Sequence, residues 1–286
     1  MENCVHKIGN VTILLLALFY LLLSGCLTPM KKHDSMPYKN TQLSVSDDNW
    51  GSTNWNELNI SLEAALCYYK SLMTFNSDTP IFILRSEDQL PSFSHPLTEI
   101  LKDRTNIYLA AENNQQSRFL YQWTHEIIHY ALNREFRPDR DKFAWFIESI
   151  CEMSSIYYMV NYDLTGECGR DVDSRYWRLA HIKYGINQIK KVDYNENDQF
   201  LSIYINEKLT ELEENRELRD INRVIAVNML PHFMENPNLW SFIPLLSNIP
   251  YTESMSFRDY IEAWMNLIPD NKKEEFQTFV NSLLPS

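Results

Sequence analysis

The stretch Thr124-His125-Glu126-Ile127-Ile128-His129 decides how this chain is interpreted. His125 and His129 are four positions apart, so in a helix they lie one turn apart on the same face. Two imidazoles placed in this way can converge on one zinc ion, at about 2.0–2.1 Å from each nitrogen. Glu126 follows the first histidine, where its carboxylate can reach a water that the metal activates. The pattern therefore predicts one zinc ion per chain, with Glu126 as general base.

The segments around this motif predict short strands and long helices. Apolar residues recur at helical spacing over residues 115–132 and again over 142–158. Two short apolar runs, Ile81 to Leu84 and Ile107 to Ala110, predict strands that precede the first of these helices. The histidine motif is therefore expected in the middle of a helix that packs on a small sheet.

Helical patterns also flank this central region. An earlier helix is expected to begin after Ser61. Beyond the centre, helices are expected over residues 201–218, 221–230 and 257–267, and a last one after Asp270. Ser256 and Asp259 form the pattern of a capping box at the start of the third of these.

A third metal ligand is available in the second central helix. Glu148 follows His129 after 18 intervening residues, in the segment Trp145-Phe146-Ile147-Glu148. A catalytic zinc ion takes three protein ligands and one water, and two histidines with one glutamate supply them. HExxH, 18 residues and then W-x-x-E resembles the arrangement of gluzincin metallopeptidases, especially their aminopeptidase branch. Ser149 and Cys151 stand where that family prefers Gly and Ala, and both are small enough to keep the two helices close.

The resemblance covers about residues 60 to 160 and implies further roles. Glu152 would orient a ligand histidine by hydrogen bonding to its other nitrogen. The strand Ile107 to Ala111 would lie at a sheet edge beside the cleft and pair with extended substrate backbone. Gluzincins also use a Tyr or His to stabilise the oxyanion; His181, His232 and Tyr176 are candidates by residue type alone, and the sequence selects none of them.

The N-terminal segment predicts a lipid anchor. Residues 1–25 read as a signal peptide whose apolar run from Val11 to Leu23 is too short to span a bilayer comfortably. Leu23-Ser24-Gly25-Cys26 resembles a bacterial lipobox, in which Cys26 is lipidated and becomes the mature N-terminus. Leu27, by resemblance to enterobacterial lipoproteins, favours the outer membrane, facing the periplasm, if the cell has one.

The cysteine count limits the number of disulfides, and the net charge bears on nucleic-acid binding. Cys67, Cys151 and Cys168 lie beyond the signal, so one disulfide at most can form among them, and the sequence does not fix the pairing. No Cys–His signature supports Cys151 as a nucleophile, so it is interpreted as a small buried residue. The net charge of −12 makes a broad basic surface for nucleic acid unexpected.

The sequence thus predicts an α+β fold, with a small zincin-type sheet on the HExxH helix and a mostly helical C-terminal subdomain. The expected boundaries are a signal peptide at 1–25, a lipidated tether at 26–54, a catalytic core at 55–165 and a helical subdomain at 166–286. The expected activity is zinc-dependent hydrolysis of peptides or proteins in the bacterial cell envelope. Two alternatives remain: a zinc-binding lipoprotein that assists envelope assembly with little turnover, and a helical interaction module without metal.

Overall fold

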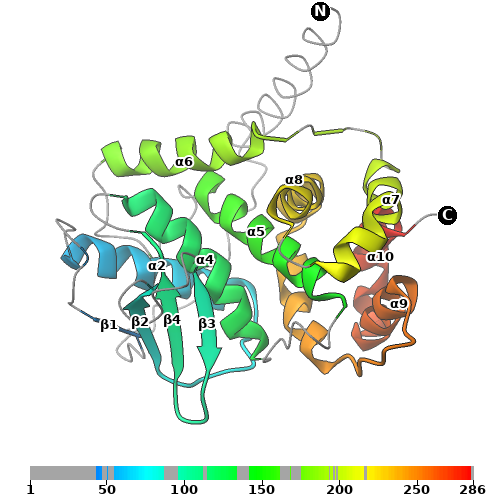
Figure 1. Ribbon diagram of the computed structural model, residues 1–286, viewed down its shortest axis with the longest axis horizontal. Coiled ribbons are helices and arrows are strands. Elements are labelled where there is room, and N and C mark those ends of the chain that lie inside the picture. Colours follow the sequence, from blue (N-terminus) through cyan, green and yellow to red (C-terminus); the bar gives the residue numbers. More distant parts are fainter. Residues whose placement is uncertain are drawn as a thin grey trace, which may run out of the picture.

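A computed structural model gives the arrangement of the elements (Figure 1). It describes residues 43–46, 50, 55–86, 96–111, 115–133, 142–161, 168, 175–192, 194–195, 197, 199–215 and 218–284, with the backbone alone at 55–57 and 175–177. The predicted signal peptide, the lipobox and Cys26 lie outside these residues. Within them, no helix is both long and apolar enough to cross a membrane.

A four-stranded mixed sheet forms one side of the fold. Its strands are β1 (Leu43–Val45), β2 (Ile81–Arg85), β3 (Leu97–Ile100) and β4 (Thr105–Leu109), in the spatial order β1-β2-β4-β3. The first three strands of that spatial order run parallel, and β3 pairs antiparallel with β4. All five residues of β4 are buried, as expected for a strand with neighbours on both sides.

Two predictions about this sheet are wrong. The strand predicted at Ile107 to Ala111 corresponds to β4, which lies inside the sheet and not at its edge. The edge beside β4 is β3, a strand that the sequence pattern did not predict. The folded part also begins before Trp55, because β1 and the buried Trp50 lie within the segment 26–54 that was expected to be a tether.

Two helices connect the sheet to the rest of the core. These are α2 (Trp55–Leu72) and α4 (Gln116–Leu132), which pack against each other, and α4 packs on β3 and β4 (Figure 1). The Trp123 indole donates a hydrogen bond of 2.9 Å to the Leu62 carbonyl and so joins α4 to α2. Asn133 ends α4 in the left-handed conformation, with φ of 47°, which asparagine tolerates better than most residues.

The helical side of the molecule is built around α5 (Ala144–Val160), which packs against α4, α6 and α8. Nearly every side chain of α5 is buried, which explains why its sequence is mostly apolar. The remaining elements are α6 (Arg175–Ile189), α7 (Phe200–Glu214), α8 (Arg219–Glu235), η2 (Pro237–Asn248), α9 (Phe257–Leu267), η3 (Asp270–Lys272) and α10 (Lys273–Leu283).

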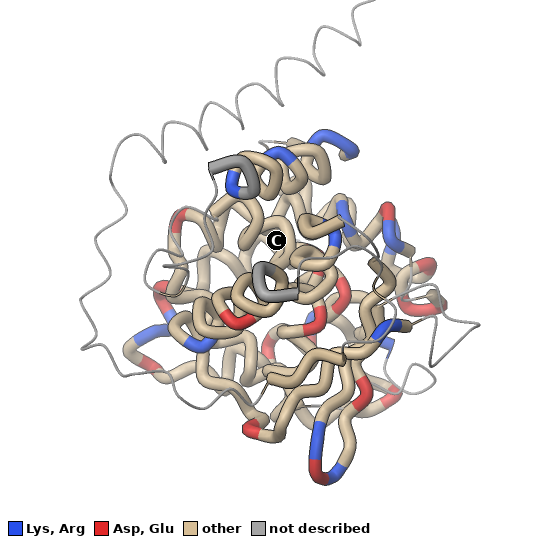
Figure 2. Tube along the Cα trace, turned by 90° about the vertical axis from the view of Figure 1, so that its left-hand side faces the viewer, with Lys and Arg blue, Asp and Glu red and all other residues tan. Residues whose placement is uncertain are grey.

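The predicted α+β class is confirmed, with one small sheet and mostly helical content. The capping box is also confirmed, since the Ser256 hydroxyl accepts from the Asp259 amide and the Asp259 carboxylate accepts from the Ser256 amide. In Figure 2, basic and acidic positions are interspersed over most of the described part of the chain, whereas the uppermost helix carries basic positions without acidic ones.

A disulfide joins Cys67 of α2 to Cys168, and Cys151 is free and buried. The sequence allowed a single bridge without fixing its partners, and the fold makes this pairing. The closed loop spans a sequence separation of 101 residues and contains both α4 and α5.

Candidate metal centre

The candidate site lies between α4 and α5. His125 and His129 project from one face of α4, and their ring centroids are 5.4 Å apart. Glu148, on α5, faces both rings: its Oε2 lies 3.2 Å from His125 Nε2, and its Oε1 lies 3.6 Å from His129 Nε2. The three predicted ligands are therefore brought together by the contact between the two helices.

These side chains are reachable from solvent. The exposed fraction is 18% for the His125 side chain, 14% for that of His129 and 22% for that of Glu148. In contrast, Trp145 and Ile150 of α5 are fully buried. The candidate ligands thus lie at the surface end of a buried helix contact, where a small ion can reach them from solvent.

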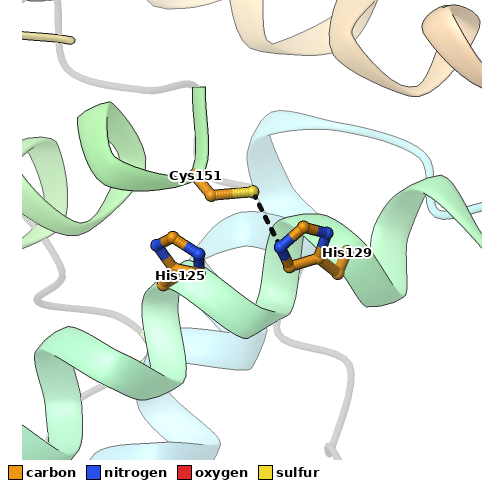
Figure 3. A group of neighbouring side chains, drawn as sticks. All are labelled: His125, His129 and Cys151. Atoms are coloured by element: carbon orange, nitrogen blue, oxygen red, sulfur yellow. Dashed lines mark hydrogen bonds between the residues drawn. The ribbon is translucent and has the colours of Figure 1, made fainter. Parts of the chain in front are cut away.

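Cys151 adds a donor that the sequence did not predict as part of the site. Its Sγ lies 3.5 Å from His129 Nε2 (Figure 3). Donor atoms of His125, His129 and Cys151 all lie within 4.8 Å of one another, close enough to hold a metal ion. Cys151 is therefore placed as a member of the cluster and not only as a small packing residue.

The distances fit a metal ion. Two donors bound tetrahedrally to one zinc ion, each at about 2.0–2.1 Å, lie about 3.3–3.4 Å apart. The contact from Glu148 Oε2 to His125 Nε2, at 3.2 Å, is near that separation, and the contact to His129 Nε2, at 3.6 Å, is made by the other oxygen, Oε1. Imidazole, carboxylate and thiolate are also the ligand types that zinc uses in proteins. The residues present therefore fit the ion that the sequence predicts.

Charges around the site affect its titration. Burial alone would lower the pKa of His125, but its hydrogen bond with Glu148 and three nearby carboxylates raise that pKa to about 9. Burial raises the pKa of the Cys151 thiol well above its usual range, and the same carboxylates raise it further. In the metal-free protein both groups hold a proton at neutral pH, so a metal ion must displace these protons when it binds.

Glu126 is buried, with 2% of its surface exposed, and is held from the sheet side. The Thr98 hydroxyl, on the edge strand β3, donates a hydrogen bond of 2.7 Å to Glu126 Oε2. Sequence reasoning missed Thr98, because a threonine in a four-residue strand far from the motif gives no signal of its own. The bond fixes the carboxylate that was predicted to act as general base.

Glu152 lies one turn beyond Glu148 on α5, as its spacing predicts. Its carboxylate forms an ion pair with a basic side chain of α8, that of Arg223. Arg223 Nε donates a hydrogen bond of 2.7 Å to Glu152 Oε1. Burial opposes the charge of Arg223, but Glu152 raises the pKa of its guanidinium. Glu152 also contributes to the negative field at His125. The predicted hydrogen bond from Glu152 to a ligand histidine stays a prediction.

The candidates for the oxyanion residue lie elsewhere in the helical part. The His181 ring, on α6, is hydrogen-bonded through Nδ1 to the Ser117 hydroxyl at 2.9 Å. The His232 ring, on α8, packs against Phe279, with 5.6 Å between ring centroids. The side chain of Tyr176 lies outside the described residues. These contacts select none of the three.

Comparison with known proteins returns no relative. No protein-family model, no curated protein and no solved structure matches the chain. The interpretation of the site therefore rests on its own geometry and chemistry.

Proposed function

We propose that the protein is a zinc-dependent peptidase held at the bacterial cell envelope by a lipid on Cys26. One observation carries this proposal: the Glu148 carboxylate lies within 3.2 and 3.6 Å of the two histidine nitrogens of a HExxH helix. Hydrolysis additionally needs a base next to the ion. Glu126 stands between the two histidines in sequence and is held by Thr98.

The proposed mechanism assigns a task to each residue. His125, His129 and Glu148 would hold zinc, which when bound would supply the positive charge that acidifies a water and polarises a carbonyl group. Glu126 accepts a proton from the attacking water as the new carbon–oxygen bond forms. It then gives this proton to the amine nitrogen as the carbon–nitrogen bond breaks. Thr98 keeps the Glu126 carboxylate in position throughout.

The substrate is proposed to lie along β3. This strand ends the sheet in the described part of the chain, and its Thr98 contacts the proposed base. An extended peptide that pairs with such an edge gains affinity from backbone hydrogen bonds, with little dependence on its side chains. A peptide or protein of the envelope is therefore the proposed substrate class.

The disulfide supports the proposed location. Bonds between cysteines persist in oxidising compartments such as the periplasm and the cell surface, and are rare in the cytosol. The pair Cys67–Cys168 is consistent with export by the signal peptide proposed for residues 1–25.

The decisive experiment is Glu126→Gln in the full-length chain, assayed on casein and on a peptide library. We expect zinc content near one ion per chain to be kept and the cleavage rate to fall by about 10²–10⁴-fold, because only the proton acceptor is lost. Glu63→Gln, a matched change on α2, should leave the rate unaltered. Equal cleavage by wild type and Glu126→Gln would refute the proposal.

A second function is favoured by the presence of Cys151 in the cluster. Four protein donors around zinc are typical of structural sites, whereas catalytic sites keep an open position. A zinc-binding lipoprotein that acts as an assembly scaffold would use such a site. In that case Glu126→Gln would complement a deletion strain as well as the wild type does, and purified protein would contain zinc but cleave nothing.

A further inference from the structure

Cys151 is placed unlike an ordinary core cysteine. It is fully buried, and it is the free cysteine in the described part of the chain. Its sulfur points from α5 towards the imidazole of His129 on α4, as Figure 3 shows. The distance of 3.5 Å to His129 Nε2 is a polar contact to a residue that belongs to the proposed metal site.

That distance matches two ligands of one ion. A sulfur at about 2.3 Å and a nitrogen at about 2.0–2.1 Å from the same tetrahedral zinc lie about 3.5–3.6 Å apart. The observed separation of Sγ and Nε2 is 3.5 Å. The donors of His125, His129 and Cys151 also lie within 4.8 Å of one another, so all three face the same small region.

The helix geometry brings donors from α4 and α5 into contact at His129. On α4 the two histidines are spaced i, i+4, and on α5 Glu148 and Cys151 are spaced i, i+3, so each pair shares a helix face. These two faces meet where α4 packs on α5. Glu148 and Cys151 each contact His129 Nε2, at 3.6 and 3.5 Å.

We propose that the Cys151 sulfur is a fourth protein ligand of the ion held by His125, His129 and Glu148. The inference rests on the proposed metal site and adds the ligand that takes the position otherwise left for water. On binding, the S–H bond breaks, the proton passes to solvent and a sulfur–metal bond forms, so no oxidant or reductant is needed. A thiolate also selects soft or borderline ions such as zinc over magnesium, calcium and manganese.

This ligand changes what the site can do. With four protein donors, an ion bound here would have no open position, and hydrolysis would require the Cys151 sulfur to leave it. The two possible functions of the site therefore differ by the state of one sulfur–metal bond.

X-ray absorption at the zinc edge of the full-length chain, loaded with zinc alone, tests this proposal. We expect one sulfur scatterer at about 2.3 Å together with nitrogen or oxygen scatterers at about 2.0–2.1 Å. Cys151→Ser should remove the sulfur scatterer. Loss of a residue that only hydrogen-bonds to a metal ligand typically weakens metal binding about 10–100-fold. Because Cys151 is proposed as a direct ligand, Cys151→Ser should weaken zinc binding at least about 10-fold.

The control is Ser149→Ala, a small buried change on the same helix. The Ser149 hydroxyl donates to the Trp145 carbonyl at 2.9 Å within α5, so this variant should keep both the sulfur scatterer and the affinity. A zinc spectrum with nitrogen and oxygen alone in the wild type would overturn the inference and leave the proposed peptidase standing. Absence of zinc binding by the wild type would overturn both.

Discussion

Thr98 and Glu126 illustrate how much of this site depends on single side chains. The Thr98 hydroxyl, on the edge strand β3, donates a hydrogen bond of 2.7 Å to the Glu126 carboxylate on α4. Glu126 is only 2% exposed. A hydrogen bond to a charged group contributes about 1.5–3 kcal/mol net, more than one between neutral groups. Removing this donor should therefore affect the proposed base more than the fold.

Thr98→Val keeps the shape of the side chain and removes the donor. We expect peptide cleavage, measured as kcat/KM, to fall by about 10–100-fold, because the bond that positions Glu126 is lost. Thr98→Ser retains a hydroxyl and should retain most of the activity, and zinc content should be equal in all three proteins. Wild-type cleavage by Thr98→Val would show that the bond has no catalytic role.

His181 makes the stability of the fold depend on pH. Burial lowers the pKa of this ring to about 4, whereas in an unfolded chain it is about 6.5. Between these values the unfolded chain binds a proton that the folded protein does not. Stability should therefore fall as the pH falls from about 6.5 to about 4, with a total contribution on the order of 3 kcal/mol.

Denaturant unfolding at several pH values measures this contribution. The wild type should lose stability over that pH interval relative to His181→Gln, which does not titrate. Parallel stability curves for the two proteins across the interval would contradict the prediction.

At the scale of the elements, the crossing of α6 over α5 is unusually close. A Cβ placed on Gly185 of α6 would lie 2.8 Å from Met159 Cβ and 3.0 Å from Val160 Cγ1. Both neighbours belong to the buried helix α5, so neither can move away easily. The glycine is needed here for the helices to approach each other.

Gly185→Ala tests this close contact between α6 and α5, and the substitution has two opposing effects on stability. Alanine favours a helix over glycine by about 1 kcal/mol, but overpacking a core contact costs about 1–3 kcal/mol. We expect a net loss of stability, seen as a lower midpoint of thermal unfolding. Asn187→Ala, at an exposed position of the same helix, should not lower it. A more stable Gly185→Ala would mean that α5 yields at the crossing.

The elements also show what the sequence could and could not predict. Helical spacing of apolar residues predicted a helix at 115–132, close to the observed α4. This spacing can be recognised in the sequence of the segment itself, without knowing what packs against it. β1 and β3 were missed, since three or four residues are too few to show a strand pattern, and pairing with β2 and β4 makes them strands.

The candidate site divides in the same way. Helical spacing predicted His125 and His129 as a pair, and the resemblance to gluzincins added Glu148. Their distances agree with that grouping. Contacts that join distant segments gave no signal. Arg223 is 71 positions from Glu152, and the direction of the Cys151 sulfur depends on how α5 is rotated against α4.

At the scale of the whole molecule, the disulfide constrains the chain over a sequence separation of 101 residues. In the chain-entropy model, a closed loop of about 100 residues gains about 4.7 kcal/mol from the restricted unfolded state. The double variant with Cys67→Ala and Cys168→Ala should therefore lose on the order of 3–5 kcal/mol of stability, measured by denaturant unfolding.

Reduction of the wild type provides an independent check. A thiol reductant should shift its unfolding midpoint towards that of the double variant and should not shift the variant itself. An unchanged wild-type midpoint under complete reduction would show that the bridge adds nothing to stability.

The same bridge has a consequence for how the chain responds to proteolytic cleavage. Every residue assigned to the metal centre, from Thr98 to Glu152, is numbered between Cys67 and Cys168, so all of them belong to one covalent ring. Cleavage of one peptide bond within this ring leaves two fragments that the disulfide still joins. A single cut between α4 and α5 would thus leave the histidines and the carboxylate in one molecule, and a second cut or a reductant would be needed to part them.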